Sequence, residues 1–351
     1  MINKESLNNE WITKVAKKHK ADPILVEKVV RALYLLELLQ QSELQFIFKG
    51  GTALMLLLPE PRRFSIDIDI IVSEKPKNIE ILFDEIIKNS DFTEYKEDER
   101  KAHSNIEKAH YKFYYKPVTN ARAEQEYILL DILYEKSHYG AHTTEIPIKS
   151  SFLITEGEDL TVTVPVPEAI LGDKLTAYAP NTTGVPYGRD KEVEIIKQLF
   201  DIGHLFDIAK DVETIAKVFD QFAKTELAYR ELTDKSPHDV LEDTFQTGMV
   251  IGTRGKAGEG NFNELQKGIQ NIRNFIFSEP FHLERAMVPA AKAAYLTAII
   301  KTGTKEIQRF SDPKEIAEWV IEQPFETRLN KLKKSNPEAF FYWYQTVKLI
   351  E

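Results

Sequence analysis

The feature that most constrains the fold is the stretch SIDIDIIVS at positions 65–73. Asp67 and Asp69 alternate with isoleucines before the stretch becomes fully apolar, a pattern that predicts a β-strand entering a hydrophobic core. Because successive side chains of a strand leave opposite faces, both carboxylates leave the same face, about 7 Å apart. The stretch predicts a sheet with an acidic pair on one face. A solvated acidic surface is the competing interpretation of this pair taken alone.

A pair of glycines precedes this acidic strand. A short β-type run over 45–49 ends at Gly50 and Gly51, and 52–58 then resumes as a helix, with Thr52 available as its cap. Free N–H groups and the dipole at a helix N-terminus favour phosphate binding by about 0.3–2 kcal/mol. This order of elements predicts a triphosphate site beside the acidic pair. The nearby cations are Lys49, Arg62 and Arg63.

A third carboxylate, Asp131, lies in the run YILLDILYE, where its neighbours along the chain are apolar. A carboxylate buried among such residues is costly unless a cation meets it. Mg²⁺ prefers oxygen ligands and keeps part of its coordination sphere for phosphates and water. Three aspartates on neighbouring strands therefore predict a site for Mg²⁺ or Mn²⁺.

Composition excludes several classes of site. The 351 residues contain no cysteine, which excludes disulfides, thiolate metal sites and thiol nucleophiles. None of the eight histidines forms an HExxH-type pair, so none is assigned to a metal. The longest apolar run, 53–58, is too short to cross a bilayer, and the N-terminus has no secretory signal. We therefore expect a cytoplasmic protein with no membrane partner.

The charge balance bears on nucleic-acid binding. A formal net charge of −9 argues against a protein that coats nucleic acid through bulk charge, although a local basic cleft remains compatible with it. The densest basic run consists of Arg328, Lys331, Lys333 and Lys334. We expect this run to be a solvated helix face, with contact to an RNA backbone as the alternative.

Hydrophobic periodicity predicts an α+β fold with two domains, 1–165 and 166–351, which meet near Pro165. The first domain is expected to open with two helices, the second capped by Asp22 ahead of Pro23. It should continue with a helix over 78–89 and strands over 111–115, 127–134 and 160–164. Helices are then expected over 168–178, 191–206, 212–232, 238–252, 263–277, 283–302, 313–322 and 337–350. The glycine-rich segment 254–261 should be a connector, because no strand precedes it.

Taken together, these motifs resemble a known family. The sequence FKGGTALMLL followed by RRFSIDIDIIV is similar to the signature of the AbiEii/AbiGii abortive-infection toxins, a branch of the polymerase-β-like nucleotidyltransferases. Three further segments resemble parts of that family. The N-terminal helix of the family is similar to ILVEKVVRALYLLELL, its lysine segment to EAILGDKLTAYA, and its later aspartate segment to IIKQLFDIGHLFDI. The resemblance covers about residues 22–210. It implies a nucleotidyltransferase-type mixed sheet with flanking helices, followed by a helical domain that contributes the lysine and later aspartate motifs.

The resemblance implies roles for the matching residues. The implied nucleotide-binding residues are Lys49, Gly50, Gly51, Thr52, Arg63, Ser65 and Lys174. The implied catalytic residues are Lys174, Asp201 and three metal-binding aspartates, Asp67, Asp69 and Asp131. A solvated helix lysine is the alternative interpretation of Lys174. Gln198 replaces the first acid of the later motif, which leaves Asp207 open as an alternative to Asp201.

The implied activity is transfer of a nucleoside monophosphate from an NTP to an acceptor hydroxyl, with release of pyrophosphate. The resemblance further implies an RNA acceptor such as the tRNA 3′ end, and a toxin neutralised by a cognate antitoxin protein. Two alternatives stay open, a DxD-type glycosyltransferase and a non-catalytic nucleotide-binding module. The glycine pair close to the acidic strand argues against the first, and the retained carboxylates argue against the second.

Overall fold

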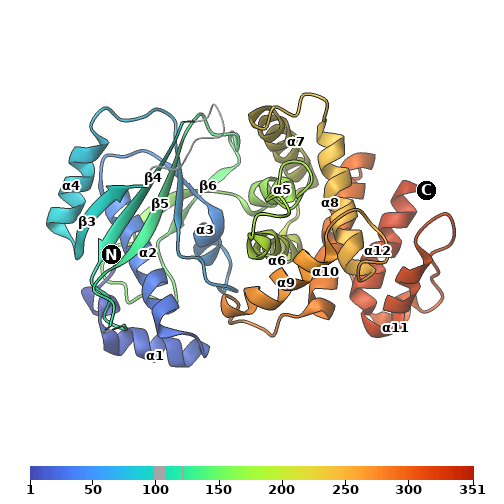
Figure 1. Ribbon diagram of the computed structural model, residues 1–351, viewed down its shortest axis with the longest axis horizontal. Helices are drawn as coiled ribbons and strands as arrows, with labels where there is room; N and C mark the ends of the chain where they lie inside the picture. Colours follow the sequence, from blue (N-terminus) through green and yellow to red (C-terminus); the bar gives the residue numbers. More distant parts are fainter. Residues whose placement is uncertain (99–106, 121) are drawn as a thin grey trace. The chain divides into compact units, whose positions relative to one another are not determined.

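The computed structural model describes residues 1–98, 107–120 and 122–351, which divide into two compact units (Figure 1). The first unit comprises Met1–Pro165 with Phe275–Glu279, and the second comprises Val166–Asn274 with Pro280–Glu351. The first combines a sheet with helices, whereas the regular secondary structure of the second is helical. The predicted α+β class is therefore correct.

A five-stranded mixed sheet forms the centre of the first unit, with its strands in the order β1-β2-β5-β4-β3. Its strands are β1 (Ile47–Lys49), β2 (Ile68–Val72), β3 (Phe92–Glu97), β4 (Lys108–Tyr115) and β5 (Glu126–Tyr134). Neighbouring strands are antiparallel except β2 and β5, which are parallel. A separate antiparallel pair consists of β6 (Thr143–Pro147) and β7 (Thr161–Pro165).

Two helices pack against one face of the five-stranded sheet through aromatic side chains. The helices of this unit are η1 (Lys4–Leu7), α1 (Asn9–His19), α2 (Pro23–Gln41), α3 (Gly50–Leu57) and α4 (Ile79–Asn89). Phe83 of α4 packs edge-on against Tyr111 and Phe113 of β4, with ring centroids 4.9 and 5.1 Å apart. Tyr34 of α2 stacks on Phe92 of β3. Because burial alternates along β4 and β5, polar side chains of these strands leave the opposite face.

The second unit is an assembly of helices. They are α5 (Pro167–Ala177), α6 (Glu192–Ile208), α7 (Val212–Tyr229), α8 (Pro237–Gly252), α9 (Phe262–Asn271), η2 (Ile272–Asn274), α10 (Leu283–Thr302), η3 (Pro313–Ile316), η4 (Thr327–Lys331), α11 (Leu332–Ser335) and α12 (Pro337–Ile350). The central helix α10 packs against α6, α8 and α12. Among the described residues, no helix is both long and apolar enough to cross a membrane.

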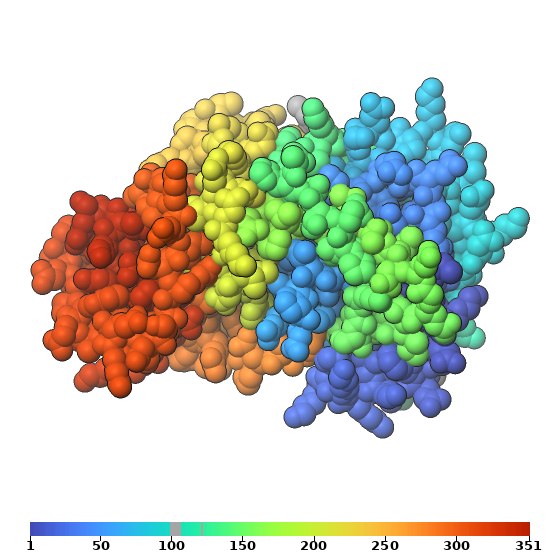
Figure 2. Space-filling model, turned by 180° about the vertical axis from the view of Figure 1, so that it is seen from behind, coloured from blue at the N-terminus to red at the C-terminus, as the bar shows by residue number. Residues whose placement is uncertain are grey.

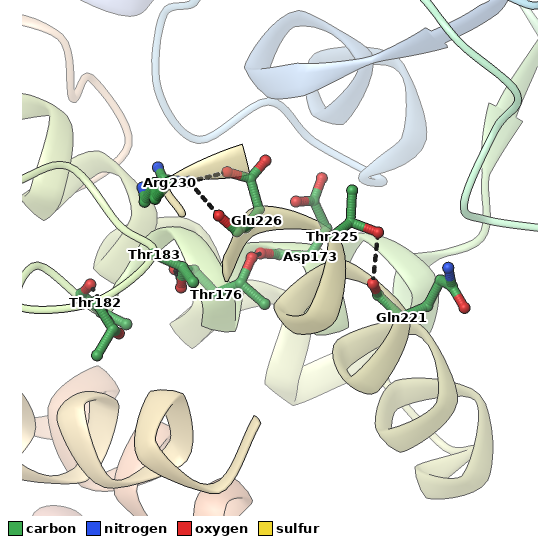
Figure 3. A network of polar contacts seen from close by, with 9 residues as sticks. Asp173, Thr176, Thr182, Thr183, Gln221, Thr225, Glu226 and Arg230 are labelled. Carbon is green, nitrogen blue, oxygen red and sulfur yellow. Dashed lines mark hydrogen bonds and ion pairs between the residues drawn. The ribbon is translucent and has the colours of Figure 1, made fainter. Parts of the chain in front are cut away.

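Helix α5 carries the predicted lysine and packs closely along α7. A Cβ at Gly172 would lie 2.7 Å from the carbonyl oxygen of Ile215, so the glycine lets the two backbones touch. Figure 3 shows polar side chains of both helices in this region. Thr176 Oγ1 donates to the backbone carbonyl of Asp173 in α5, and Thr225 Oγ1 donates to a backbone carbonyl within α7. These hydrogen bonds are internal to each helix, so the contact itself depends on close packing.

Two helix predictions are wrong. The predicted helix over 313–322 is only the short turn η3, because its buried residues Ile316 and Ile321 are five positions apart and do not share a helix face. The predicted helix over 263–277 ends as an α-helix at Asn271. The residues that follow η2 pack in the first unit instead, where Phe277 lies 4.6 Å from the ring of Phe64.

The strand predictions need three corrections. The predicted strand over 65–73 is shorter, so Asp69 lies in β2 but Asp67 immediately precedes it. Strands β3 and β6 were not predicted, because their sequences FTEYKE and TTEIP are mostly polar and partly exposed.

The predicted Asp22 cap of α2 is confirmed, since the Asp22 side chain accepts a hydrogen bond from the Ile24 N–H at 2.9 Å.

Candidate nucleotidyltransferase site

Four polar residues form a row across the sheet, on the face opposite the aromatic core. Lys49 of β1 pairs in register with Asp69 of β2, which pairs with Asp131 of β5, which pairs with His110 of β4. Residues that pair directly across neighbouring strands project from the same face. The structure therefore brings together two of the three predicted metal-binding aspartates, flanked by a lysine and a histidine.

The surroundings of Asp131 differ from the prediction. Side chains alternate along β5, so Leu130 and Ile132 face the core while the Asp131 side chain is 28% exposed on the polar face. Its carboxylate Oδ1 lies 2.6 Å from Nδ1 of His110, in a hydrogen bond. The expectation that Asp131 is buried among apolar residues, and needs a cation for that reason, is therefore wrong. Sequence reasoning missed His110, although the alternation of KAHYKFYY places it on the same face as Lys112.

The glycine pair lies at the start of α3, in close contact with polar side chains of neighbouring segments. Gly50 has a positive φ of 80°, and a Cβ there would overlap the carboxylate of Asp69. A Cβ at Gly51 would lie 2.6 Å from Oγ of Ser65 and 2.8 Å from Nη2 of Arg63. Only glycines allow all three side chains to reach the N-terminus of α3.

Thr52 connects this helix to the acidic segment. Its hydroxyl is buried and donates to the backbone carbonyl of Asp67 at 2.6 Å. The expectation that Thr52 caps the helix is wrong, because Lys49 occupies the N-cap position and makes no side-chain capping bond. Thr52 instead holds the backbone of Asp67 beside the first turn of α3.

The predicted nucleotide-binding residues of the first unit therefore converge on one end of α3. The converging residues are Lys49, Gly50, Gly51, Thr52, Arg63 and Ser65, with Asp67 and Asp69 beside them. Arg63 is buried, and its Nη1 donates to the carbonyl of Phe64 at 3.0 Å. The backbone N–H of Phe64 in turn donates to the carbonyl of Phe275, 2.8 Å away. A distant part of the chain thus fixes the loop that carries Arg63.

The two predicted site residues of the second unit form a buried ion pair. Nζ of Lys174 lies 2.8 Å from Oδ2 of Asp201, and their side chains are only 8% and 5% exposed. Nζ also donates to Oε1 of Gln198 at 3.0 Å. Asp207 instead pairs with Lys292 at 2.7 Å and is half-exposed. The interpretation of Lys174 as a solvated lysine on a helix surface is therefore wrong. The acid that contacts Lys174 is Asp201 rather than Asp207.

The donor set can be tested against the predicted metal. Asp69 and Asp131 present oxygen donors from adjacent strands, while Asp67 precedes the same strand end. Within the described ranges, no three His, Asp or Glu side chains are grouped so that they could hold a metal by themselves. His103 lies outside the described residues. This set fits Mg²⁺, which is commonly held by one or two carboxylates and completes its shell with substrate phosphates and water.

A comparison with protein families identifies the fold's relatives. The model of the family described as "Nucleotidyl transferase AbiEii toxin, Type IV TA system" matches residues 31–268, which is more than half of the chain. The chain belongs to this family. The resemblance expected from the sequence is confirmed, and this AbiEii protein is a nucleotidyltransferase of a toxin–antitoxin family. Its membership sets aside the glycosyltransferase alternative.

Three solved structures illustrate the distant similarity of this chain to known proteins. A putative nucleotidyltransferase from H. pylori is 16% identical, with a TM-score of 0.47, and covers 80% of this chain and 97% of its own. JHP933 from Helicobacter pylori is 15% identical, with a TM-score of 0.45 and coverages of 79% and 93%. MenT4, a nucleotidyltransferase toxin from Mycobacterium tuberculosis H37Rv, is 11% identical, with a TM-score of 0.45 and coverages of 95% and 98%. No curated protein matches this chain.

Proposed function

We propose that this AbiEii protein transfers a nucleoside monophosphate from an NTP to a hydroxyl of RNA, such as the tRNA 3′ end. The acceptor hydroxyl releases its proton to solvent as its oxygen forms a bond to the α-phosphorus, the bond from that phosphorus to the bridging oxygen breaks, and pyrophosphate leaves. The observation that carries this proposal is the position of Asp69, which lies in register with Asp131 and against Gly50 at the start of α3. Acidic metal donors and a phosphate-binding helix end are thus adjacent.

The N-terminus of α3 is the proposed triphosphate site. The N–H groups of a first helical turn lack intrahelical partners, and no side-chain cap occupies them here among the described residues. The helix dipole also favours anions at this end. Arg63 lies beside Gly51, where its guanidinium can form charge-assisted hydrogen bonds to phosphate oxygens. We infer that Lys49 and Ser65 contribute to the same site.

We propose that Asp67, Asp69 and Asp131 hold Mg²⁺ or Mn²⁺ together with phosphate oxygens of the NTP, since these carboxylates do not form a complete metal site by themselves. When bound, the metal would neutralise charge on the phosphates and favour deprotonation of the acceptor hydroxyl. The hydrogen bond from His110 fixes the direction of the Asp131 carboxylate on the face that it shares with Asp69. His110 is therefore proposed as a positioning residue.

Lys174 is proposed as a phosphate ligand on the strength of the family resemblance. An ammonium group has three N–H donors. Asp201 and Gln198 accept two of them, which orients the group and leaves a third donor for a phosphate oxygen. We propose that Asp201 acts through Lys174 rather than on substrate.

The biological setting is also a proposal. Membership of a type IV toxin–antitoxin family supports growth inhibition by the protein and neutralisation by a cognate antitoxin protein. NTPs and RNA are both cytoplasmic, and we place the protein in that compartment.

Incubation with each α-³²P-labelled NTP and total cellular RNA tests the proposed activity. We expect label from one or more NTPs to appear in RNA, to disappear with EDTA, and to return when Mg²⁺ or Mn²⁺ is added in excess. A non-catalytic module would leave all RNA unlabelled. Label that appears only in protein or in small molecules would overturn the RNA acceptor while preserving nucleotidyl transfer.

Replacement of Gly51 by alanine tests the triphosphate site. A Cβ there collides with Ser65 and Arg63, so both must move away from the helix end. We expect the KM for NTP to rise about tenfold or more, which corresponds to a loss of about 1.4 kcal/mol. Gly140→Ala is the control for the added methyl group, because no atom lies within 4 Å of its Cβ; since the φ of Gly140 is +60°, thermal melting first checks that this variant is folded. Unchanged NTP affinity in folded Gly51→Ala would place the phosphates elsewhere.

Replacement of His110 by alanine tests the positioning role. Without its hydrogen bond, the Asp131 carboxylate loses its fixed direction, and we expect kcat to fall about tenfold with little change in the KM for NTP. His110→Gln keeps a donor and should restore part of kcat. Lys112→Ala, on the same face of β4, is the control. Equal losses in the alanine and glutamine variants would indicate that packing, not the hydrogen bond, matters.

A further inference from the structure

A second candidate site lies in the first unit, at the opposite end of α3 from the glycine pair. It is a pocket of about 910 Å³ lined by the end of α1, by residues 55–62, by part of 147–155, and by Phe277 and Ser278. Figure 2 shows the segments 55–62 and 147–155, in blue and green, on the surface of the molecule, with α1 in dark blue near them. The pocket is large enough for a ligand of several chemical groups.

Positive charge dominates the lining of this pocket. Its cations are Lys18, Lys20, Arg62 and Lys149, against a single acidic residue, Glu60. Lys149 pairs with Asp159 at 2.7 Å, whereas the other three cations make no ion pair with any described residue. The chain as a whole has a net charge of −9, so the positive charge of this pocket is opposite in sign to the net charge of the protein. Such a pocket favours an anionic ligand.

The pocket also holds polar atoms that lack partners. Oγ of Ser278 and Nε2 of His19 are buried without a hydrogen-bond partner among the described residues. The His19 ring stacks on Phe152, with centroids 4.9 Å apart, and meets Phe277 edge-on. Burial, with help from Lys18, lowers the pKa of His19, which therefore contributes a neutral ring. Both residues line the pocket, so its wall combines the lysine and arginine cations with an aromatic stack and polar groups.

The position of the pocket connects it to the proposed triphosphate site. Helix α3 has eight residues, so its two ends are about 12 Å apart. Arg62, which the sequence placed among the cations near the triphosphate, lines the pocket, whereas the next residue, Arg63, is the one that lies beside Gly51 at the other site. A nucleic-acid strand with its terminal hydroxyl at the NTP would thus have backbone phosphates a few nucleotides away within reach of the pocket.

We propose that this basic pocket binds the phosphodiester backbone of the RNA acceptor. The inference rests on the proposed function, because it assigns the acceptor a place in the same unit. Lysine ammonium groups with serine hydroxyls are typical contacts to phosphate oxygens. Protein interfaces, by contrast, are depleted in lysine and rely on aromatic anchors. The pocket explains how an acidic protein can bind RNA through a local patch.

The test compares two triple variants that remove the same charge. The pocket variant is Lys18→Gln/Lys20→Gln/Arg62→Gln, and the control is Lys331→Gln/Lys333→Gln/Lys334→Gln in the C-terminal basic run. RNA binding is measured without NTP by fluorescence anisotropy of labelled total tRNA, over a series of salt concentrations. Transfer kinetics are then measured for each variant with NTP and RNA varied separately, and thermal melting checks the fold.

We expect the pocket variant to bind RNA at least tenfold more weakly than the wild type. The plot of log affinity against log salt concentration should also become less steep by about 2, since each lost phosphate contact reduces the slope by about 0.7. The KM of the pocket variant for NTP should stay near that of the wild type, and the control should retain full affinity. Equal weakening in both variants, or unchanged RNA binding, would overturn the proposal.

These outcomes separate the pocket from the activity. If the wild type labels RNA while the pocket variant has an unchanged KM for RNA, the pocket proposal fails and the proposed function stands. If the wild type binds RNA through the pocket but labels no RNA, the proposed function fails and the binding site stands. A pocket variant with a lowered melting temperature would be replaced by the single substitution Arg62→Gln, expected to weaken RNA binding in the same direction.

Discussion

Replacing Asp69 by asparagine is expected to lower kcat for nucleotidyl transfer by about a hundredfold or more, with the melting temperature close to that of the wild type. The substitution removes a charged oxygen donor from the centre of the polar row, where preorganised electrostatic contacts have effects of this size. Stability should survive, because Asp69 lies beside Asp131 and like charges in register repel. Asp67→Asn should behave similarly.

Glu94→Gln is the matched control for this change, since Glu94 is another carboxylate of the sheet whose partner is the surface residue Lys96. Transfer is measured with saturating NTP at several Mg²⁺ concentrations, and folding is measured by thermal melting. Full activity of Asp69→Asn would remove its metal role. A folded but inactive variant supports the role, whereas a large fall in melting temperature would identify the acidic residue as structural.

Replacing Lys174 by alanine is expected to lower the free energy of unfolding by about 3–5 kcal/mol. The change leaves Asp201, whose side chain is 5% exposed, as a buried charge without its cation. Lys224→Met is the control, because its pair with Asp220 is largely exposed and should contribute at most about 1 kcal/mol. Urea denaturation of the two variants measures the difference directly.

A double variant separates the structural from the catalytic part of this effect. Lys174→Met/Asp201→Leu removes both charges, so no unpaired charge stays buried, and we expect most of the lost stability to return. If Lys174 contacts phosphate in the transition state, the double variant should be folded but should have a much lower kcat, with a smaller change in the KM for NTP. A stable double variant with normal kcat would reduce Lys174 and Asp201 to a structural pair.

The local features of the site follow from short stretches of sequence. Gly50 and Gly51 mark the turn onto α3 because only glycine combines the positive φ of the first with the close contacts of both. The acidic strand is visible in its alternation, although β2 begins only at Ile68. Capping by Asp22 is equally local. Each of these depends on residues that are close together in the chain, so their spacing alone predicts them.

Other features depend on how distant segments pair. The parallel pairing of β2 with β5 puts Asp131 beside Asp69, and the antiparallel pairing of β4 adds His110. Alternation along each strand fixes which side chains share a face, but the register between strands comes from packing of the whole sheet. Sequence reasoning therefore placed Asp131 in a strand but misjudged its surroundings and missed its histidine partner.

The sequence by itself determined the glycine turn, the acidic strand, the helical second half and the membership of a nucleotidyltransferase family. Only the tertiary structure decided that Asp201 rather than Asp207 contacts Lys174, and that the chain around Phe275 returns to hold the loop of Arg63. The physical reason is the range of the interactions. Periodicity and backbone preference act over a few residues, whereas ion pairs and strand contacts join segments whose meeting depends on the packing of the whole unit.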